Sequence, residues 1–447
     1  MAFIWWPKRD QLSDVGFASI AHVPVLFDSD WTYLRVFNRY LRERALLEWR
    51  PKSESDAHAY MRTLLSKRPR YPTKKTLENI ANHLSNFIEW MQWKSADWRA
   101  LDYTGGVMAY QSDMFSGQWA AEGSGLSAGT VNNRIGEACS FLKWAAHRRL
   151  RDQFKLVSAP VNKRGKSGTS SVGHLPNEIK ARAGGFRSDP GILRLPTEEE
   201  VLRWLRDVRL RRGPTKALMC TLVLETAIRI QEAVQWRVDT LPLDQRQWVV
   251  IGGNVQVTIC YGAKGPKRHP DSDEGPPRII SVPISLAKKL DTYRSLRRVV
   301  LHGRWVQAAK SKSEMQSRRL QPMPNRLFLS DYTGRPFTDQ AFYSGWKNVP
   351  SLPYKEWSPH LGRHYWACIT LLRSQQEKAA SIGKQLDQLP DDWITSQATT
   401  DIQLIIRPQL GHVSDETSQL YLKWIHGAVS LTKYTLEYHD LLDRIDD

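Results

Sequence analysis

The sequence has few cysteines, no long apolar run and a shortage of acidic residues, and each shortage excludes a class of protein. Its four cysteines, Cys139, Cys220, Cys260 and Cys368, show no C-x-x-C spacing, so we expect buried thiols rather than disulfides or a zinc site. No apolar stretch approaches the roughly 20 residues of a membrane helix, and the apolar start is too short for a signal peptide. A soluble protein of the reducing cytoplasm is therefore expected.

The charge balance favours a polyanionic partner. Lysine and arginine number 64 against 46 aspartates and glutamates, which gives a formal net charge of +18. Such an excess favours nucleic acid over a small acidic substrate, although a basic but ordinary surface has the same composition. The 18 tryptophans fall mostly at helical spacings among apolar residues, which predicts core packing rather than base stacking.

The 447 residues predict two or three domains. Residues 1–69 form an N-terminal extension with one amphipathic helix over 30–47, which is either an accessory DNA-binding element or a packing extension. Residues 70–157 predict a compact, all-helical domain whose two long helices begin after Thr73 and Ser127, both good N-caps.

Residues 158–195 are rich in Gly, Ser, Pro, Lys and Arg and predict a basic linker between the two domains. Five basic residues are candidate phosphate contacts, two on the second long helix and three in the linker: Arg134, Lys143, Lys163, Arg164 and Lys166. A solvated helix face and a solvated tether have the same pattern.

A further domain, 196–447, opens with the capping box Thr197 to Glu200. A helix predicted over 217–236 carries Arg229 and Glu232, three residues apart and so on one face, where the carboxylate can orient the guanidinium. Strands are predicted over 248–251, 255–261 and 278–283, and the last two form a hairpin with Lys264 at its tip.

Two further motifs lie near the end of the chain. Ser358 and Pro359 predict a helix start, so His360 and Arg363 share a face at an anion-favouring helix N-terminus. Gly411 is predicted to end a later helix, with His412 just beyond it and Tyr421 in the helix that follows.

These motifs suit one reaction when they are taken together. Attack on a phosphodiester requires cations on the non-bridging oxygens, an acceptor for the proton of the nucleophile and a donor for the leaving oxygen. The chain offers all of these without a metal or a cofactor, from the residues Arg229, Lys264, His360, Arg363, His412 and Tyr421.

The sequence from about residue 70 to 440 resembles the tyrosine recombinase, or phage integrase, family. The resemblance rests on 226–232 as the first arginine box, on 262–267 as the hairpin lysine, on 360–363 as the second box and on 410–421 as the third. It implies a fold that is mainly α with a small antiparallel β-sheet. In that fold, a helical core-binding domain and a mixed α/β catalytic domain form a C-shaped clamp around double-stranded DNA.

The resemblance also implies roles. Tyr421 would form a 3′-phosphotyrosine bond, Arg229 and Arg363 would hold the phosphate, and Lys264 would be the general acid. His360 would accept a proton, His412 would hydrogen-bond the phosphate and Glu232 would hold Arg229. The expected protein is a site-specific recombinase of a mobile element that acts as a homotetramer on two duplexes.

Ala227 stands where the family usually has glycine, and Leu361-Gly362 replaces its usual acidic and hydrophobic pair, which suggests a divergent branch. Two alternatives remain open: a topoisomerase-like or hairpin-resolving enzyme, and a catalytically inactive DNA-binding regulator. An apolar stripe that starts at Leu431 predicts a C-terminal helix that packs on its own domain or on a neighbouring protomer.

Overall fold

The protein forms two compact units in a computed structural model, residues 1–189 with 266–272 and residues 190–265 with 273–447. The structure describes residues 2–8, 11–12, 14–17, 20–49, 71–119, 123–160, 180–186, 193–265, 273–411 and 415–431. The C-shaped clamp stays a prediction.

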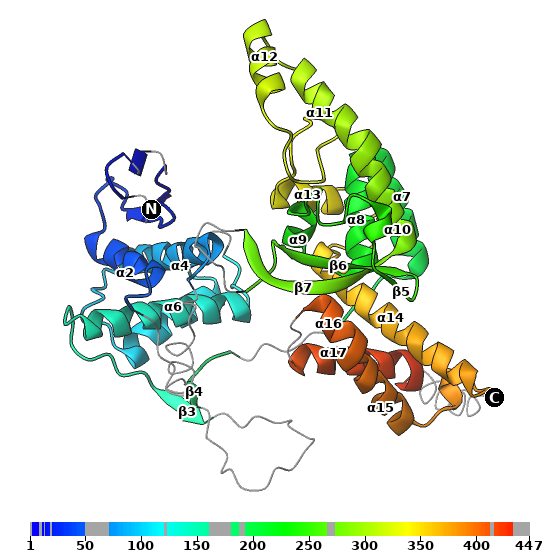
Figure 1. Cartoon of the computed structure of the whole chain (residues 1–447). Coiled ribbons are helices and arrows are strands. Elements are labelled where there is room, and N and C mark those ends of the chain that lie inside the picture. Colours follow the sequence, from blue (N-terminus) through cyan, green and yellow to red (C-terminus); the bar gives the residue numbers. More distant parts are fainter. Residues whose placement is uncertain are drawn as a thin grey trace. The chain divides into compact units, whose positions relative to one another are not determined.

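The first unit is mostly helical (Figure 1, blue to cyan). The side chains of Thr73 and Ser127 accept hydrogen bonds from the amides of Thr76 and Thr130, which confirms both predicted N-caps. Its elements are β1 (Phe3–Trp5), β2 (Val25–Phe27), α2 (Arg35–Ala45), α4 (Lys74–Trp93), η2 (Tyr103–Val107), α5 (Met108–Ser116), α6 (Ala128–His147), β3 (Ser158–Pro160) and β4 (Lys180–Arg182).

Described residues before position 50 share a core with the helices that follow them. The ring of Phe37 in α2 stacks on that of Phe141 in α6 with centroids 4.4 Å apart. Glu43 of α2 accepts hydrogen bonds from Nε1 of Trp144 in α6 at 2.7 Å and from Nε of Arg148, the residue after α6, at 2.8 Å. Packing inside this unit is therefore one role of the N-terminal residues.

The predicted linker contains ordered structure on both sides of residues 161–179, which lie outside the described part. β3 pairs with β4 in antiparallel register. The guanidinium of Arg182 then donates to Gln111 Oε1 at 2.6 Å and to Asn132 Oδ1 at 2.9 Å. These contacts attach residues 180–186 to the helical unit, a tertiary effect that a composition rich in Gly and Ser does not reveal.

The second unit combines helices with one small sheet, so the predicted fold class, mainly α with a small antiparallel β-sheet, is confirmed. In the part of the chain that the structure describes, no helix is long and apolar enough to cross a membrane. The elements of the second unit are α7 (Glu198–Arg212), α8 (Pro214–Thr226), α9 (Ile230–Val234), η3 (Gln245–Gln247), β5 (Val250–Ile251), β6 (Asn254–Tyr261), β7 (Glu274–Pro283), α10 (Ile284–Thr292), η4 (Tyr293–Arg297), α11 (Arg298–Gln307), α12 (Lys312–Leu320), α13 (Asp339–Lys347), α14 (Pro359–Ser381), η5 (Leu386–Gln388), α15 (Asp391–Asp401), η6 (Ile402–Ile406), α16 (Arg407–Leu410), α17 (Asp415–His426) and η7 (Gly427–Leu431).

The sheet has the antiparallel order β5-β6-β7, as the strand pattern predicted. Val255 lies opposite Val282 and Val257 opposite Ile280, and all four are buried, because alternate residues of a strand face one side. Cys260 is out of phase with this face and only partly buried, so the prediction of four buried thiols is wrong for this one.

The single helix predicted over 217–236 is wrong. α8 ends at Thr226 and α9 begins at Ile230, because Ala227 adopts φ 53° in the left-handed region, where an α-helix stops. Arg229 is therefore the N-cap of α9 and does not share a helix face with Glu232. The two still meet, since the carboxylate accepts the main-chain amide of Arg229 at 2.7 Å.

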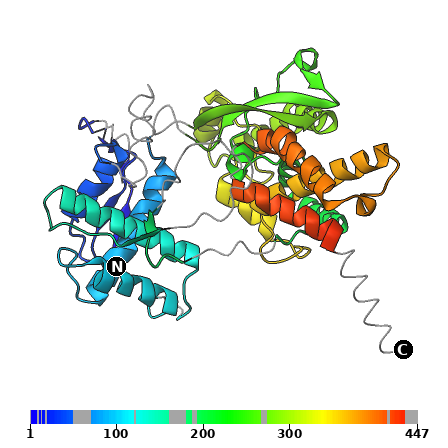
Figure 2. The ribbon, with the colours of Figure 1, turned by 90° about the horizontal axis from the view of Figure 1, so that it is seen from below.

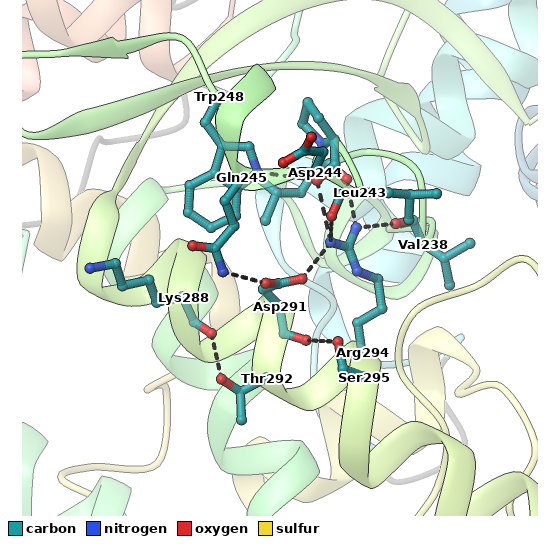
Figure 3. Close-up of polar contacts among 12 residues, drawn as sticks. Val238, Leu243, Asp244, Gln245, Trp248, Lys288, Asp291, Thr292, Arg294 and Ser295 are labelled. Carbon is teal, nitrogen blue, oxygen red and sulfur yellow. Dashed lines mark hydrogen bonds and ion pairs between the residues drawn. The ribbon is translucent and has the colours of Figure 1, made fainter.

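The loop that leads from α9 to the sheet is held by one arginine, Arg294 of η4 (Figure 3). Its guanidinium donates to the main-chain carbonyls of Val238 and Leu241 at 2.8 and 2.7 Å. The carboxylate of Asp291, one helical turn earlier, binds the same guanidinium at 2.5 Å. These bonds anchor the loop before β5 on the helix that follows the sheet.

The second unit has two apolar cores. One joins α7, α8, the sheet and α13, and the other lies among α14 to α17, which stay together in both views (Figure 1 and Figure 2). Tyr421 belongs to the second core. Six tryptophans of the two units are almost fully buried, which confirms core packing for Trp90, Trp144, Trp204, Trp236, Trp346 and Trp357.

Candidate active site

Two arginines from distant parts of the chain converge on consecutive carbonyls at the end of α16. Arg229 Nη2 donates to the carbonyl of Gly411 at 2.9 Å. Arg363 Nη2 donates to the carbonyl of Leu410 at 3.0 Å, and its Nη1 donates to that of Ala227. Main-chain acceptors thus hold both guanidinium groups beside the turn that leads to position 412.

Glu232 links the first arginine to the sheet. Its side chain is almost fully buried and accepts from Arg229 Nη1 at 3.1 Å and from Arg278 at 2.5 and 2.7 Å. Arg278 lies on β7 and was not among the predicted site residues. Arg278 is the first residue of the strand predicted over 278–283. That pattern did not indicate a contact with Glu232, because only the folded sheet brings the two side chains together.

Because of these partners, Glu232 remains ionised in the core. Burial alone would raise its pKa, but the hydrogen bonds and charges of Arg278 and Arg229 hold the pKa of Glu232 below its ordinary value. The ionised carboxylate therefore contributes stability above the unfolded pKa of about 4.3. This contribution is lost as the pH falls through the lower folded pKa.

Replacing Glu232 by glutamine is expected to lower the free energy of unfolding by about 3 kcal/mol at neutral pH, since it leaves two part-buried guanidinium groups without their counter-ion. Urea unfolding measures this loss. The difference from the unmodified chain should shrink in acid, where the carboxylate is protonated in both folded and unfolded states. Glu199→Gln, in an exposed pair with Arg203, is the matched control. An equal loss in both variants would contradict a structural role for this ion pair.

A glycine brings the hairpin tip against α9. Gly262 has φ 71°, and a Cβ there would lie 2.4 Å from the carbonyl oxygen of Gln231, so no other residue fits without a shift. Lys264 follows two residues later and is exposed. Its positive charge contributes to lowering the pKa of His360, so the lysine lies within electrostatic reach of that imidazole.

Tyr421 makes its contact with a histidine that was not predicted as a site residue. Its hydroxyl lies 3.0 Å from His364 Nδ1, and His364 Nε2 lies 3.2 Å from His360 Nε2. Both histidines belong to α14, four residues apart and therefore on one face. The spacing H-x-x-x-H in the sequence is the signal that could have identified His364.

The pKa shifts in this cluster favour neutral imidazoles and a protonated phenol. Burial raises the pKa of Tyr421, while Arg363 opposes the shift. Burial and the neighbouring His360 and Arg363 lower the pKa of His364 to about 4. Burial and nearby cations also lower the pKa of Arg363 to about 9, which leaves it charged at neutral pH.

Six other residues were predicted to contribute to the site. Arg134 and Lys143 lie on α6 of the first unit, both partly exposed. His412 and the linker residues Lys163, Arg164 and Lys166 fall outside the described residues. Within the described ranges, His, Cys, Asp and Glu side chains form no group of three that could hold a metal ion.

No protein-family model matches the chain, and no curated protein matches it. Among solved structures, the chain is similar to XerH site-specific recombinase bound to palindromic difH substrate, at 14% identity and a TM-score of 0.42, over 80% of each chain. A lambda integrase dimer bound to a COC′ core site is 14% identical with a TM-score of 0.42, over 82% of this chain and 93% of that one.

A third similar structure is the Tn1549 transposon integrase in complex with circular intermediate DNA. Its identity is 12% and its TM-score 0.40, over 87% of this chain and 94% of that chain. These three solved structures are of recombinases and integrases.

Proposed function

We propose that the chain is a site-specific DNA recombinase that cleaves and rejoins strands through a 3′-phosphotyrosine bond formed by Tyr421. One observation supports this most strongly. The guanidinium groups of Arg229 and Arg363 are fixed on the carbonyls of Gly411 and Leu410 respectively, and the helix that carries Tyr421 begins a few residues later. A phosphodiester bound there would lie beside two cations, close in sequence to the helix that carries the phenol.

The roles follow from charge and position. Arg229 and Arg363 neutralise the non-bridging oxygens as charge builds on the phosphorus, and the main-chain carbonyls and Glu232 hold them for this. Lys264, at the exposed hairpin tip, protonates the departing 5′ oxygen. His360 takes part in removing the proton of the nucleophile. His412 lies outside the described residues, and its role, a hydrogen bond to the phosphate, rests on the sequence resemblance.

The substrate is double-stranded DNA, and the reaction integrates or excises a mobile element. Contacts to the phosphate backbone come from the first unit and the linker, through the basic residues Arg134, Lys143, Lys163, Arg164 and Lys166. A homotetramer on two duplexes would exchange the strands, with the segment beyond Leu431 joining neighbouring protomers.

Cleavage is expected to proceed fully in excess EDTA and without a nucleotide, because arginines rather than a cation stabilise the transition state. Formation of the covalent protein–DNA complex with and without EDTA measures this, and added Mg²⁺ serves as the control. Strict dependence on Mg²⁺ would contradict the proposed mechanism.

The decisive experiment offers the full chain a pool of random-sequence duplexes that carry nicks, which trap a phosphotyrosine adduct. Denaturing electrophoresis followed by sequencing of the bound DNA should recover one preferred site, and peptide mapping should find the DNA on Tyr421. DNA that binds but never becomes covalently linked to the protein would favour the alternative of a catalytically inactive DNA-binding regulator. A pair of such sites in a synapsis assay then separates strand exchange from nicking and resealing alone.

A further inference from the structure

The two histidines of α14 form a hydrogen-bonded chain that starts at Tyr421. The phenol hydroxyl is 3.0 Å from one nitrogen of His364, and the opposite nitrogen of that ring is 3.2 Å from His360. Exposure rises along the chain, since Tyr421 is 2% exposed, His364 is half-buried and His360 is exposed. The chain thus runs from an apolar core to water.

The hydrogen bonds couple the protonation of the two rings. If Tyr421 donates to His364 Nδ1, the neutral ring of His364 carries its proton on Nε2. That proton points at His360 Nε2, which must then accept it. This order gives the buried phenol proton an acceptor, whereas the reverse order leaves it without one among the described residues.

We infer that His364 is the direct acceptor of the proton of Tyr421 and that His360 is the exit through which this proton leaves. The inference rests on the proposed function. As the Tyr421 oxygen bonds to phosphorus and the bond from phosphorus to the 5′ oxygen breaks, the phenol proton moves to His364 Nδ1. The Nε2 proton of His364 moves to His360, which becomes imidazolium, and Lys264 gives a proton to the 5′ oxygen. Rejoining reverses each transfer.

The surroundings keep both rings neutral, which leaves a lone pair on His364 Nδ1 and on His360 Nε2. Among the described residues, charged and titratable groups that act on them are Arg363 on α14, Arg229 before α9, Lys264 on the hairpin and Tyr421 on α17, and Cys368 lies near Tyr421. Partial desolvation, then the charges of Arg363, Arg229 and Lys264, lower the pKa of His360. When the proton has passed from His364 to His360, the positive charge lies on the exposed ring, where water solvates it.

The test uses the duplex recovered by nick trapping, with a 5′-bridging sulfur so that the acid step is not needed. His364→Gln is expected to lower the rate of adduct formation about 100-fold at neutral pH, the lower end for loss of a general base. In the unmodified chain the rate should stay flat down to pH values well below the ordinary imidazole pKa of about 6.5. In the variant it should climb with pH instead, as hydroxide replaces the lost acceptor.

Imidazole rescue separates a chemical role from a structural one. Adding imidazole to His364→Gly should restore adduct formation. His360→Gln should show a smaller loss of rate, because His364, the first acceptor of the Tyr421 proton, remains in that variant. His426→Gln is the matched control, since His426 lies on the Tyr421 helix but bonds to Thr395. An unchanged rate and pH profile in His364→Gln, or a larger and rescuable loss at His360, would overturn the relay while leaving the recombinase standing. If the unmodified chain forms no adduct, both the proton relay and the proposed recombinase function are wrong.

Discussion

Replacing Tyr421 by phenylalanine is expected to abolish the covalent protein–DNA adduct while leaving duplex binding nearly unchanged. The substitution removes one oxygen, the proposed nucleophile, and the ring still fills its place in the core of α14 to α17. The lost hydroxyl also frees His364 Nδ1 from its hydrogen bond, but that half-buried nitrogen can be hydrated. The measurement is denaturing electrophoresis on nicked duplexes beside a gel-shift titration of the same DNA.

Tyr365→Phe is the matched control for this substitution. Tyr365 is also buried in the second unit and lies beside His364 in sequence, so its loss tests the general effect of removing a buried phenol. Adduct formation should persist in this variant. An adduct that still forms in Tyr421→Phe would transfer the nucleophile to another tyrosine, with Tyr434 and Tyr438 the next candidates in the sequence.

Replacing Arg363 by lysine is expected to lower the rate of adduct formation by about 10²- to 10³-fold, the range seen when one preorganised donor to a transition state is removed. The charge is kept, but a lysine cannot donate to Ala227 and Leu410 and to a phosphate in the fixed fork geometry of a guanidinium. Single-turnover cleavage of the trapped duplex measures the fall.

Arg373→Lys provides the comparison on the same helix. Arg373 is exposed and pairs with Glu198 across the surface, so the same change there should leave the cleavage rate within a factor of about two. Equal losses in the two variants would point to a general defect of α14. An unchanged rate in Arg363→Lys would contradict the proposed role of this arginine in holding the phosphate.

Local sequence determined much of this protein. N-caps at Thr73, Ser127 and Ser358 and the box from Thr197 to Glu200 marked helix starts correctly, because capping joins residues only three positions apart. The alternation of apolar residues around Val255 and Val257 also predicted a strand correctly, since residues on one face of a strand recur at every second position. The order of motifs along the chain was enough to suggest the chemistry.

Tertiary structure decided what the motifs touch. The break at Ala227 turned Arg229 away from a helix face and toward the carbonyl of Gly411, a contact across 182 positions of sequence. Arg278 reached Glu232 only because β7 pairs with β6, and His364 met Tyr421 only because α17 packs on α14. Periodicity and capping depend on neighbours within a few residues, whereas these contacts depend on how separate elements pack, and local sequence does not encode that geometry by itself.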